Sequence, residues 1–249
     1  MPVYLDSAAT TKPCRACIDA MTEAMTKTYG NPSSLHTMGL EAQLAVDGAR
    51  RFIAAALDCE ASALTFTSGA TESNHLAIRG AAGAYGRRRR RVVTTTVEHA
   101  SVRGAFDLLE AEGFEVVRIA PGADGTFSAA EIEAAVNAET CLISMMLVNN
   151  ETGAVLPVKE AFAAIKRNDP QVITHCDAVQ GFLKLPLTPQ KLHADLLTVS
   201  GHKVHAAKGV GALYHKKGIR LKPLLTGGEQ EGGMRAGTES VPLIAGFGA

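Results

Sequence analysis

Five groups of polar residues in this sequence each follow a short apolar stretch, at the point where the stretch ends. The groups are Ser68-Gly69-Ala70-Thr71, His99, Asn149-Asn150-Glu151, Asp177 with Gln180, and Ser200-Gly201-His202-Lys203. The apolar stretches are short and rich in β-branched residues, which predicts strands. In a parallel α/β sheet, ligands bind at the carboxyl ends of the strands. We therefore expect these polar side chains to gather around one site.

The chemistry of these groups suits a phosphorylated cofactor that forms an imine. Gly69 and Ala70 let backbone N–H groups approach an anion, and the start of a helix adds partial positive charge. Lys203, Asp177 and His99 supply an amine, a carboxylate and an imidazole. Each group taken alone has a plainer interpretation as a helix cap, a tight turn or a solvated loop. Their recurrence at equivalent strand ends favours a shared site.

The elements that must position these residues alternate along the chain. Predicted strands cover residues 63–67, 92–95, 115–119, 142–148, 172–175, 196–199 and 211–214, and predicted helices begin near Glu72 and cover 101–112, 129–136 and 158–166. The strands are apolar throughout, which is typical of strands covered by helices on both faces. The pattern predicts an α/β fold with a largely parallel central sheet.

Two further helices are expected ahead of the first strand. The first has apolar residues at helical spacing, at Cys14, Cys17, Ile18, Met21 and Met25, with Pro13 at its start. The second runs from about Gly39 to Leu57, and its predicted buried face consists of Leu44, Ala45, Phe52, Ile53 and Leu57.

The composition of the 249-residue chain excludes several classes of protein. Lys and Arg number 25 against 25 Asp and Glu, so the formal net charge is +0, which argues against non-specific nucleic-acid binding. The basic run 87–91 is expected to be a solvated turn rather than a nucleic-acid patch. No apolar run approaches the roughly 20 residues of a membrane helix, and the first residues show no signal-peptide pattern. An odd number of cysteines, 5, favours reduced thiols in the cytoplasm.

A series of motifs runs through the chain from Tyr4 to Thr238. They are Tyr4-Leu5-Asp6-Ser7-Ala8-Ala9-Thr10-Thr11, Gly30-Asn31-Pro32-Ser33-Ser34-Leu35-His36, Thr67-Ser68-Gly69-Ala70-Thr71-Glu72-Ser73-Asn74, Glu98-His99, Asn149-Asn150-Glu151-Thr152-Gly153, Asp177-Ala178-Val179-Gln180, Ser200-Gly201-His202-Lys203, Lys208-Gly209-Val210-Gly211-Ala212-Leu213-Tyr214, Gly227-Gly228-Glu229-Gln230-Glu231 and Arg235-Ala236-Gly237-Thr238. Together they resemble the cysteine desulfurase family, and they occur in the family's order over nearly the whole chain. The last motif resembles the branch that contains the nitrogen-fixation and housekeeping iron–sulfur assembly enzymes.

The resemblance implies a pyridoxal 5′-phosphate (PLP) enzyme with the aminotransferase fold of fold type I. Lys203 matches the lysine that binds the cofactor as an imine, and Asp177 matches the carboxylate that pairs with the pyridinium nitrogen. Gln180 matches the contact to the ring's phenolic oxygen. His99 matches the imidazole that stacks on the ring, and the resemblance implies a role for it in proton transfer. A core histidine and a capping aspartate are the plainer alternatives for His99 and Asp177.

The resemblance also assigns residues to the phosphate and the substrate. Ala70, Thr71, Ser200 and His202 match the phosphate ligands. Thr238 matches a phosphate contact that the family supplies from the neighbouring subunit, which implies a homodimer. Asn150 matches a residue close to the ring oxygen and the substrate, and Asn31 matches a loop residue near the substrate.

The chain departs from the family in one respect. The family's persulfide-forming cysteine and its substrate-binding arginine lie well after the lysine, and none of the cysteines at 14, 17, 59, 141 and 176 matches. The resemblance implies that residues 1–15 belong to an incomplete small domain, with exposed apolar surface, and that residues 16–249 form the PLP-binding large domain. Cys14 and Cys17 are expected to be buried packing residues, Cys176 likewise, and His202 with His205 is not expected to bind a metal.

The resemblance implies that L-cysteine is converted to L-alanine, with its sulfur passed on as a persulfide to iron–sulfur scaffold or other acceptor proteins. This chain by itself is expected to bind the cofactor with little turnover. One alternative is a lyase acting on selenocysteine or cysteine sulfinate, which depends less on a cysteine nucleophile. Another is a PLP-binding remnant without catalysis that pairs with iron–sulfur assembly proteins.

Overall fold

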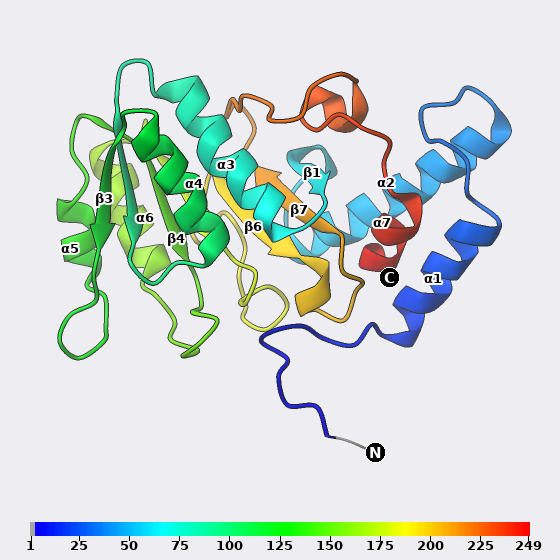
Figure 1. The fold of residues 1–249 in the computed structure, drawn as a ribbon, viewed down its shortest axis with the longest axis horizontal. Helices are drawn as coiled ribbons and strands as arrows, with labels where there is room; N and C mark the ends of the chain where they lie inside the picture. The colour runs from blue at the N-terminus through cyan, green and yellow to red at the C-terminus, as the bar shows by residue number, and fades with distance from the viewer. Residues whose placement is uncertain (1–2) are drawn as a thin grey trace.

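The computed structural model describes residues 3–249 and contains one seven-stranded sheet with the order β1-β7-β6-β5-β4-β2-β3 (Figure 1). The strands are β1 (Leu64–Thr67), β2 (Arg91–Thr95), β3 (Glu115–Ile119), β4 (Thr140–Met146), β5 (Ile173–Asp177), β6 (Leu196–Ser200) and β7 (Gly211–His215). The pairs from β3 to β6 are all parallel, and β7 runs antiparallel to both β1 and β6. The predicted α/β fold with a largely parallel sheet is confirmed.

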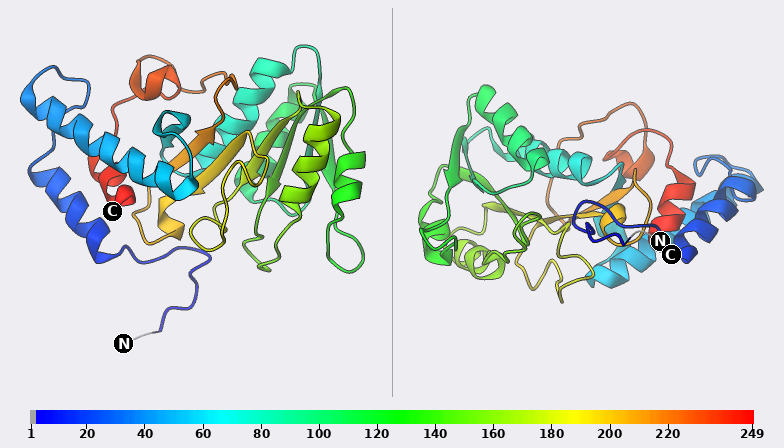
Figure 2. Two further views of the ribbon diagram at one scale, coloured as in Figure 1. Left: turned by 180° about the vertical axis from the view of Figure 1, so that it is seen from behind. Right: turned by 60° about the horizontal axis from the view of Figure 1, so that its bottom comes forward.

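Helices cover both faces of the sheet, because the strand side chains alternate between two apolar layers. α3 (Ala70–Tyr85) and α4 (Ala100–Ala111) lie on the near face in Figure 1. There Phe106 packs in the same cluster as Leu142 of β4. α5 (Ala129–Ala134) and α6 (Val158–Asn168) lie on the far face, which Figure 2 shows from behind. The neighbouring Ile143 packs in the cluster that contains Phe162 of α6.

α1 (Arg15–Thr26), α2 (Thr37–Leu57) and α7 (Val241–Gly248) form a helical group beside the β1 edge of the sheet (Figure 1). Three short 3₁₀ segments, at Ala61–Ala63, Gly201–Lys203 and Gln230–Gly233, complete the regular structure. The predicted buried face of α2 is partly wrong. Ile53 and Leu57 are buried and Ala45 is half-buried, but Leu44 is 55% exposed and Phe52 is 71% exposed.

α7 lies close to both of its neighbours, α1 and α2. It packs on α2 at Ala49, where a Cβ added at Gly248 would lie 2.5 Å from the Ala49 Cα. The buried face of α2 therefore runs through Ala42, Val46 and Ala49 to Ile53 and Leu57, and at helical spacing Leu44 and Phe52 lie outside this face. In α1, Cys17 is buried against this group and Met21 is half-buried, whereas Ile18 and Met25 are exposed.

The predicted burial of the cysteines holds for Cys17 and Cys176 but is wrong for Cys14. Cys14 is exposed because it caps α1, and its Sγ accepts a hydrogen bond from the backbone N–H of Cys17. The expected apolar exposure near the N-terminus is confirmed, since Val3 and Leu5 are more than 80% exposed. Met1 and Pro2 lie outside the described residues. Within residues 3–249, no helix combines the length and the apolar character needed to cross a membrane.

Candidate active site

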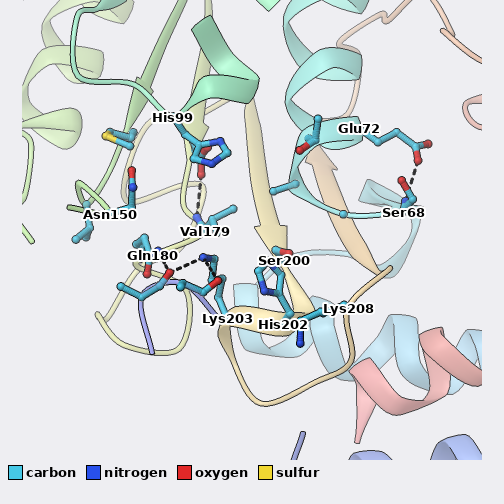
Figure 3. A pocket seen from close by; sticks show the side chains of 18 of the residues that line it. Ser68, Glu72, His99, Asn150, Val179, Gln180, Ser200, His202, Lys203 and Lys208 are labelled. Carbon is cyan, nitrogen blue, oxygen red and sulfur yellow. Dashed lines mark hydrogen bonds between the residues drawn. The ribbon is translucent and has the colours of Figure 1, made fainter. Parts of the chain in front are cut away.

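A pocket of about 680 Å³ opens where β4, β5 and β6 end and where α3 and α4 begin (Figure 3). Nine residues predicted for the site line it: Ala70, Thr71, His99, Asn150, Asp177, Gln180, Ser200, His202 and Lys203. The N-terminal segment also reaches this pocket, through Asp6, Ala8 and Ala9. The carboxyl ends of parallel strands therefore bring together residues that are far apart in sequence.

Asp177 ends β5 with its carboxylate inside the protein. Its Oδ2 accepts a hydrogen bond of 2.8 Å from Nδ2 of Asn74, and its Oδ1 accepts one of 3.1 Å from the backbone N–H of Val179. Burial raises the pKa of Asp177, whereas the bond from Asn74 is the largest effect that lowers it. A carboxylate accepts more than two hydrogen bonds. Asp177 therefore retains capacity for a cationic N–H group entering from the pocket.

Lys203 follows β6 in the short 3₁₀ turn Gly201–Lys203, and Figure 3 shows it near Gln180. Its Nζ donates hydrogen bonds to the carbonyl oxygens of Ala8 and Ala9. Burial lowers the pKa of Lys203 and the positive charge of Lys184 lowers it further, against the opposing effects of the carboxylates of Asp6 and Asp177. A lowered pKa increases the share of neutral amine, which is the nucleophilic form.

His99 caps the start of α4, with its ring at the pocket wall. Its Nδ1 lies 2.8 Å from Oγ of Ser101 and accepts a hydrogen bond of 3.2 Å from the Ser101 backbone N–H. Asn150 and Gln180 line the pocket from the loops after β4 and β5. The Gln180 side chain donates to the Ala8 carbonyl and accepts from Lys184, which fixes its amide against the N-terminal segment.

The start of α3 forms an anion cradle. Within residues 3–249, no hydrogen-bond acceptor is paired with the backbone N–H of Ala70 or Thr71, as expected for the first turn of a helix. Gly69 has φ +147°, which requires glycine. A Cβ at Gly211 of β7 would lie 2.9 Å from the Gly69 Cα, so both glycines allow this loop to sit against the sheet.

Two further polar side chains, those of Ser200 and His202, line the same pocket. The hydroxyl of Ser200 is buried and has no hydrogen-bond partner among the described residues. An unsatisfied buried hydroxyl is costly, and a bound anion would satisfy it. The ring of His202 is held by a contact of 3.1 Å between its Nδ1 and Oγ1 of Thr10. Burial lowers the pKa of His202, and the charges of Lys203 and Lys208 lower it further.

Two predicted residues lie away from this pocket. Asn31 sits in the loop between α1 and α2, where its Oδ1 accepts a hydrogen bond from the Ser33 backbone N–H. Thr238 is exposed and lines a smaller hollow with Arg235 and Ser240. Among residues 3–249, no group of three or more His, Cys, Asp and Glu side chains is arranged to hold a metal ion.

Sequence reasoning left three buried polar residues beside the site without a role: Asn74, Glu98 and Ser101. Asn74 and Glu98 stand in the motifs that carry the resemblance, but only their long-range contacts reveal what they do. Oε1 of Glu98 accepts hydrogen bonds from the Thr95 hydroxyl and the Met146 backbone N–H, at 2.6 and 2.9 Å. Glu98 thereby joins the end of β2 to the end of β4, directly before His99.

The aminotransferase class-V family matches residues 3–249. This chain belongs to that family. Among curated relatives, it is 43% identical to cysteine desulfurase 2 of Trichormus variabilis, over 99% of this chain and 61% of the relative. It is 42% identical to cysteine desulfurase IscS of Methanosarcina thermophila, over 99% of this chain and 60% of the relative. The chain therefore spans about 61% of the length of these relatives.

Comparison with solved structures agrees with this assignment. A NifS-like protein superposes with a TM-score of 0.96 at 38% identity, covering 100% of this chain and 68% of the other. A structure described as SspA in complex with cysteine gives a TM-score of 0.95 at 37% identity, covering 99% and 71%. The resemblance to cysteine desulfurases and the expected fold are thus confirmed.

Class-V aminotransferases and cysteine desulfurases depend on PLP. The pocket fits that cofactor in its donor set. It has free amides and an unpartnered hydroxyl for a phosphate, an amine for an aldehyde and a buried carboxylate for a ring nitrogen.

Proposed function

We propose that this chain binds PLP in the pocket and supplies the cofactor-binding part of a cysteine desulfurase, which converts L-cysteine to L-alanine. The observation that carries the proposal is the shared pocket of Asp177 and Lys203, with the start of α3 beside them. A lysine, a buried acid and an anion cradle are the three groups that a phosphorylated pyridine aldehyde requires.

When bound, PLP would supply an electron-withdrawing ring for the chemistry at the substrate carbon. Asp177 keeps the ring nitrogen protonated through a charge-assisted hydrogen bond. The amides of Ala70 and Thr71 with the hydroxyl of Ser200 hold the phosphate. Lys203 would hold the aldehyde through its amine, and its lowered pKa suits that amine to take up or return a proton. Gln180 and His99 contact the ring, and Asn150 lies close to the substrate.

We also propose that the sulfur acceptor is not among the side chains of this pocket. None of the described residues lining it is a cysteine, and Cys17, Cys141 and Cys176 are buried elsewhere. Burial raises the pKa of Cys141 to about 11, which disfavours its nucleophilic thiolate. This chain alone should therefore bind the cofactor and release little alanine from cysteine.

The oligomeric state, the domains, the cellular location and the partners of the chain follow from the same proposed function. A homodimer would bring Thr238 of a second copy to the phosphate, which suits its exposed position outside its own pocket. Residues 1–15 would belong with a small domain, and residues 16–249 form the large domain. Five free cysteines suit the reducing cytoplasm. Iron–sulfur scaffold proteins and other sulfur-acceptor proteins are the proposed recipients.

The test is reconstitution of the purified chain with PLP, followed by its visible absorption. We expect a band from the lysine-bound cofactor, and after borohydride reduction a phosphopyridoxyl group on Lys203. Lys203→Ala should lack both, whereas Lys191→Ala, at an exposed lysine, should keep both. A band that survives Lys203→Ala would overturn the proposal.

The substrate is tested by alanine release from cysteine, selenocysteine and cysteine sulfinate, with a thiol reductant present. Release from selenocysteine or sulfinate but not from cysteine would favour the alternative lyase. Persulfide formation by this chain alone would contradict the proposed lack of an acceptor cysteine.

A further inference from the structure

A continuous chain of hydrogen bonds joins Asp177 to His99 inside the protein. Nδ2 of Asn74 lies 2.8 Å from Oδ2 of Asp177 and 2.9 Å from Oγ of Ser101. Oγ of Ser101 lies 2.8 Å from Nδ1 of His99. Asn74 is fully buried and Ser101 nearly so, so bulk water does not compete for these contacts.

The carboxylate fixes the orientation of the Asn74 amide. An amide nitrogen carries two protons, and here each proton has one acceptor, Asp177 or Ser101. A rotated amide would place its oxygen against the Asp177 carboxylate, which is repulsive. Oδ1 of Asn74 consequently faces away and has no partner among the described residues. Asn74 Oδ1 thus stays without a hydrogen bond, while both protons on Nδ2 have acceptors.

The remaining proton in this series of hydrogen bonds is that of the Ser101 hydroxyl. Because Oγ already accepts from Asn74, its own proton is free for Nδ1 of His99. The Ser101 backbone N–H also donates to Nδ1, over 3.2 Å. An imidazole nitrogen that faces two donors must offer its lone pair to them. The neutral ring then carries its proton on Nε2.

We propose that Asn74 and Ser101 are positioning residues that set the proton arrangement of the pocket, by holding His99 as its Nε2–H tautomer and by donating to the Asp177 carboxylate. The inference rests on the proposed function, since it gives His99 and Asp177 their parts toward the cofactor. Its consequence is that His99 offers an N–H donor, and not a lone pair, to a group bound beside it.

The first test is the tautomer of His99 by NMR of the cofactor-free chain labelled with ¹⁵N-histidine. In the wild type, we expect one protonated nitrogen, Nε2, and one unprotonated nitrogen, Nδ1. In Ser101→Ala the hydroxyl donor is gone, so the two ¹⁵N shifts of His99 should move toward each other. Unchanged shifts in Ser101→Ala would overturn the proposal.

Ser144→Ala is the matched control. Ser144 is a buried serine whose Oγ lies 2.7 Å from Nδ1 of another histidine, His175. This variant should move the signals of His175 and leave those of His99 in place. If it moves the His99 signals as much as Ser101→Ala does, the effect is general loosening, and the proposed role is wrong.

The second test follows the Asp177 carboxyl carbon through a pH titration. Asn74→Ala removes the hydrogen bond that most lowers the pKa of Asp177, so the titration should shift to higher pH. Asn74→Ser serves if the alanine variant does not fold, because serine is too short to bridge both acceptors. An unshifted titration of Asp177 in the Asn74 variant would contradict the proposed role of Asn74.

These measurements need no cofactor and no turnover. If the chain does not bind PLP, the proposed function is wrong, but the NMR results still test the roles of Asn74 and Ser101. If PLP binds normally and the NMR signals of the variants are unchanged, only the positioning role is wrong.

Discussion

Nζ of Lys203 donates a hydrogen bond of 2.8 Å to the carbonyl oxygen of Ala9, although the two residues are 194 positions apart. The amine also donates to the neighbouring carbonyl of Ala8. The segment before α1 thus lies against the lysine that is proposed to bind the cofactor. Because the carbonyls of Ala8 and Ala9 hold this amine, the position of the N-terminal segment bears directly on the site.

Thr11 anchors this segment, which gives the first prediction. Its buried hydroxyl donates to the His202 carbonyl over 3.0 Å and accepts from the His205 N–H over 2.7 Å. Thr11→Val leaves that N–H without its partner and should lower the free energy of unfolding by about 1–3 kcal/mol in urea titrations. The exposed Thr22→Ala should change it by less than about 0.5 kcal/mol. Equal effects of the two substitutions would contradict the anchoring role.

Glu98 gives a prediction about pH. The carboxyl is 1% exposed, and burial, with the charge of Asp177 adding to it, raises its pKa from 4.5 to about 8. Between these values the folded chain holds a proton that the unfolded chain has released, so stability should fall as pH rises through this window. Each unit of pKa difference corresponds to about 1.4 kcal/mol.

Glu98→Gln cannot release that proton, so its unfolding free energy should fall less than that of the wild type over the same window. Urea unfolding at a series of pH values measures the difference. Glu160→Gln, at an exposed position of α6, should follow the wild type. A Glu98→Gln curve parallel to the wild-type curve would disprove the assignment of a neutral buried carboxyl.

The ion pair between Arg50 and Glu231 leads to a prediction about stability. It is bidentate, at 2.7 and 2.8 Å, with side chains 16% and 2% exposed, and it holds the 3₁₀ turn Gln230–Gly233 against β1. Glu231→Ala leaves a largely buried guanidinium unpaired and should cost about 3–5 kcal/mol. Asp19→Ala, at the exposed pair with Arg15, should cost about 1 kcal/mol or less. Comparable losses in the two variants would show that burial does not matter here.

Gly211 gives a prediction about the anion cradle. Its added Cβ would lie 2.8 Å from the Val199 carbonyl oxygen and 2.9 Å from the Gly69 backbone. Gly211→Ala should therefore displace the loop before α3, lower stability by about 1–3 kcal/mol and weaken PLP binding. Gly104→Ala, in α4, is the control, because its added Cβ would meet no described heavy atom within 4 Å apart from its chain neighbours and the adjacent helix backbone. Gly104→Ala should raise the free energy of unfolding by up to about 1 kcal/mol. If Gly211→Ala binds PLP with wild-type affinity, the close-approach argument is wrong.

The sequence by itself determined how strands and helices follow one another along the chain, because apolar β-branched runs and helical periodicity are local signals. It also determined which polar residues gather in the pocket, since parallel strands place their carboxyl ends at one edge whatever the details of packing. His99, Asp177 and Lys203 were found in this way, with the family resemblance assigning each a role.

Only the tertiary structure decided which apolar residues are buried and which polar residues touch. Leu44 and Phe52 face outward because α2 packs through the face that carries Ala49, where α7 approaches closely at Gly248. Asn74 meets Asp177 across 103 positions of sequence, and no periodicity within α3 reports that contact. Such contacts depend on how whole elements pack, and a local pattern carries no information about the distance between residues on different elements.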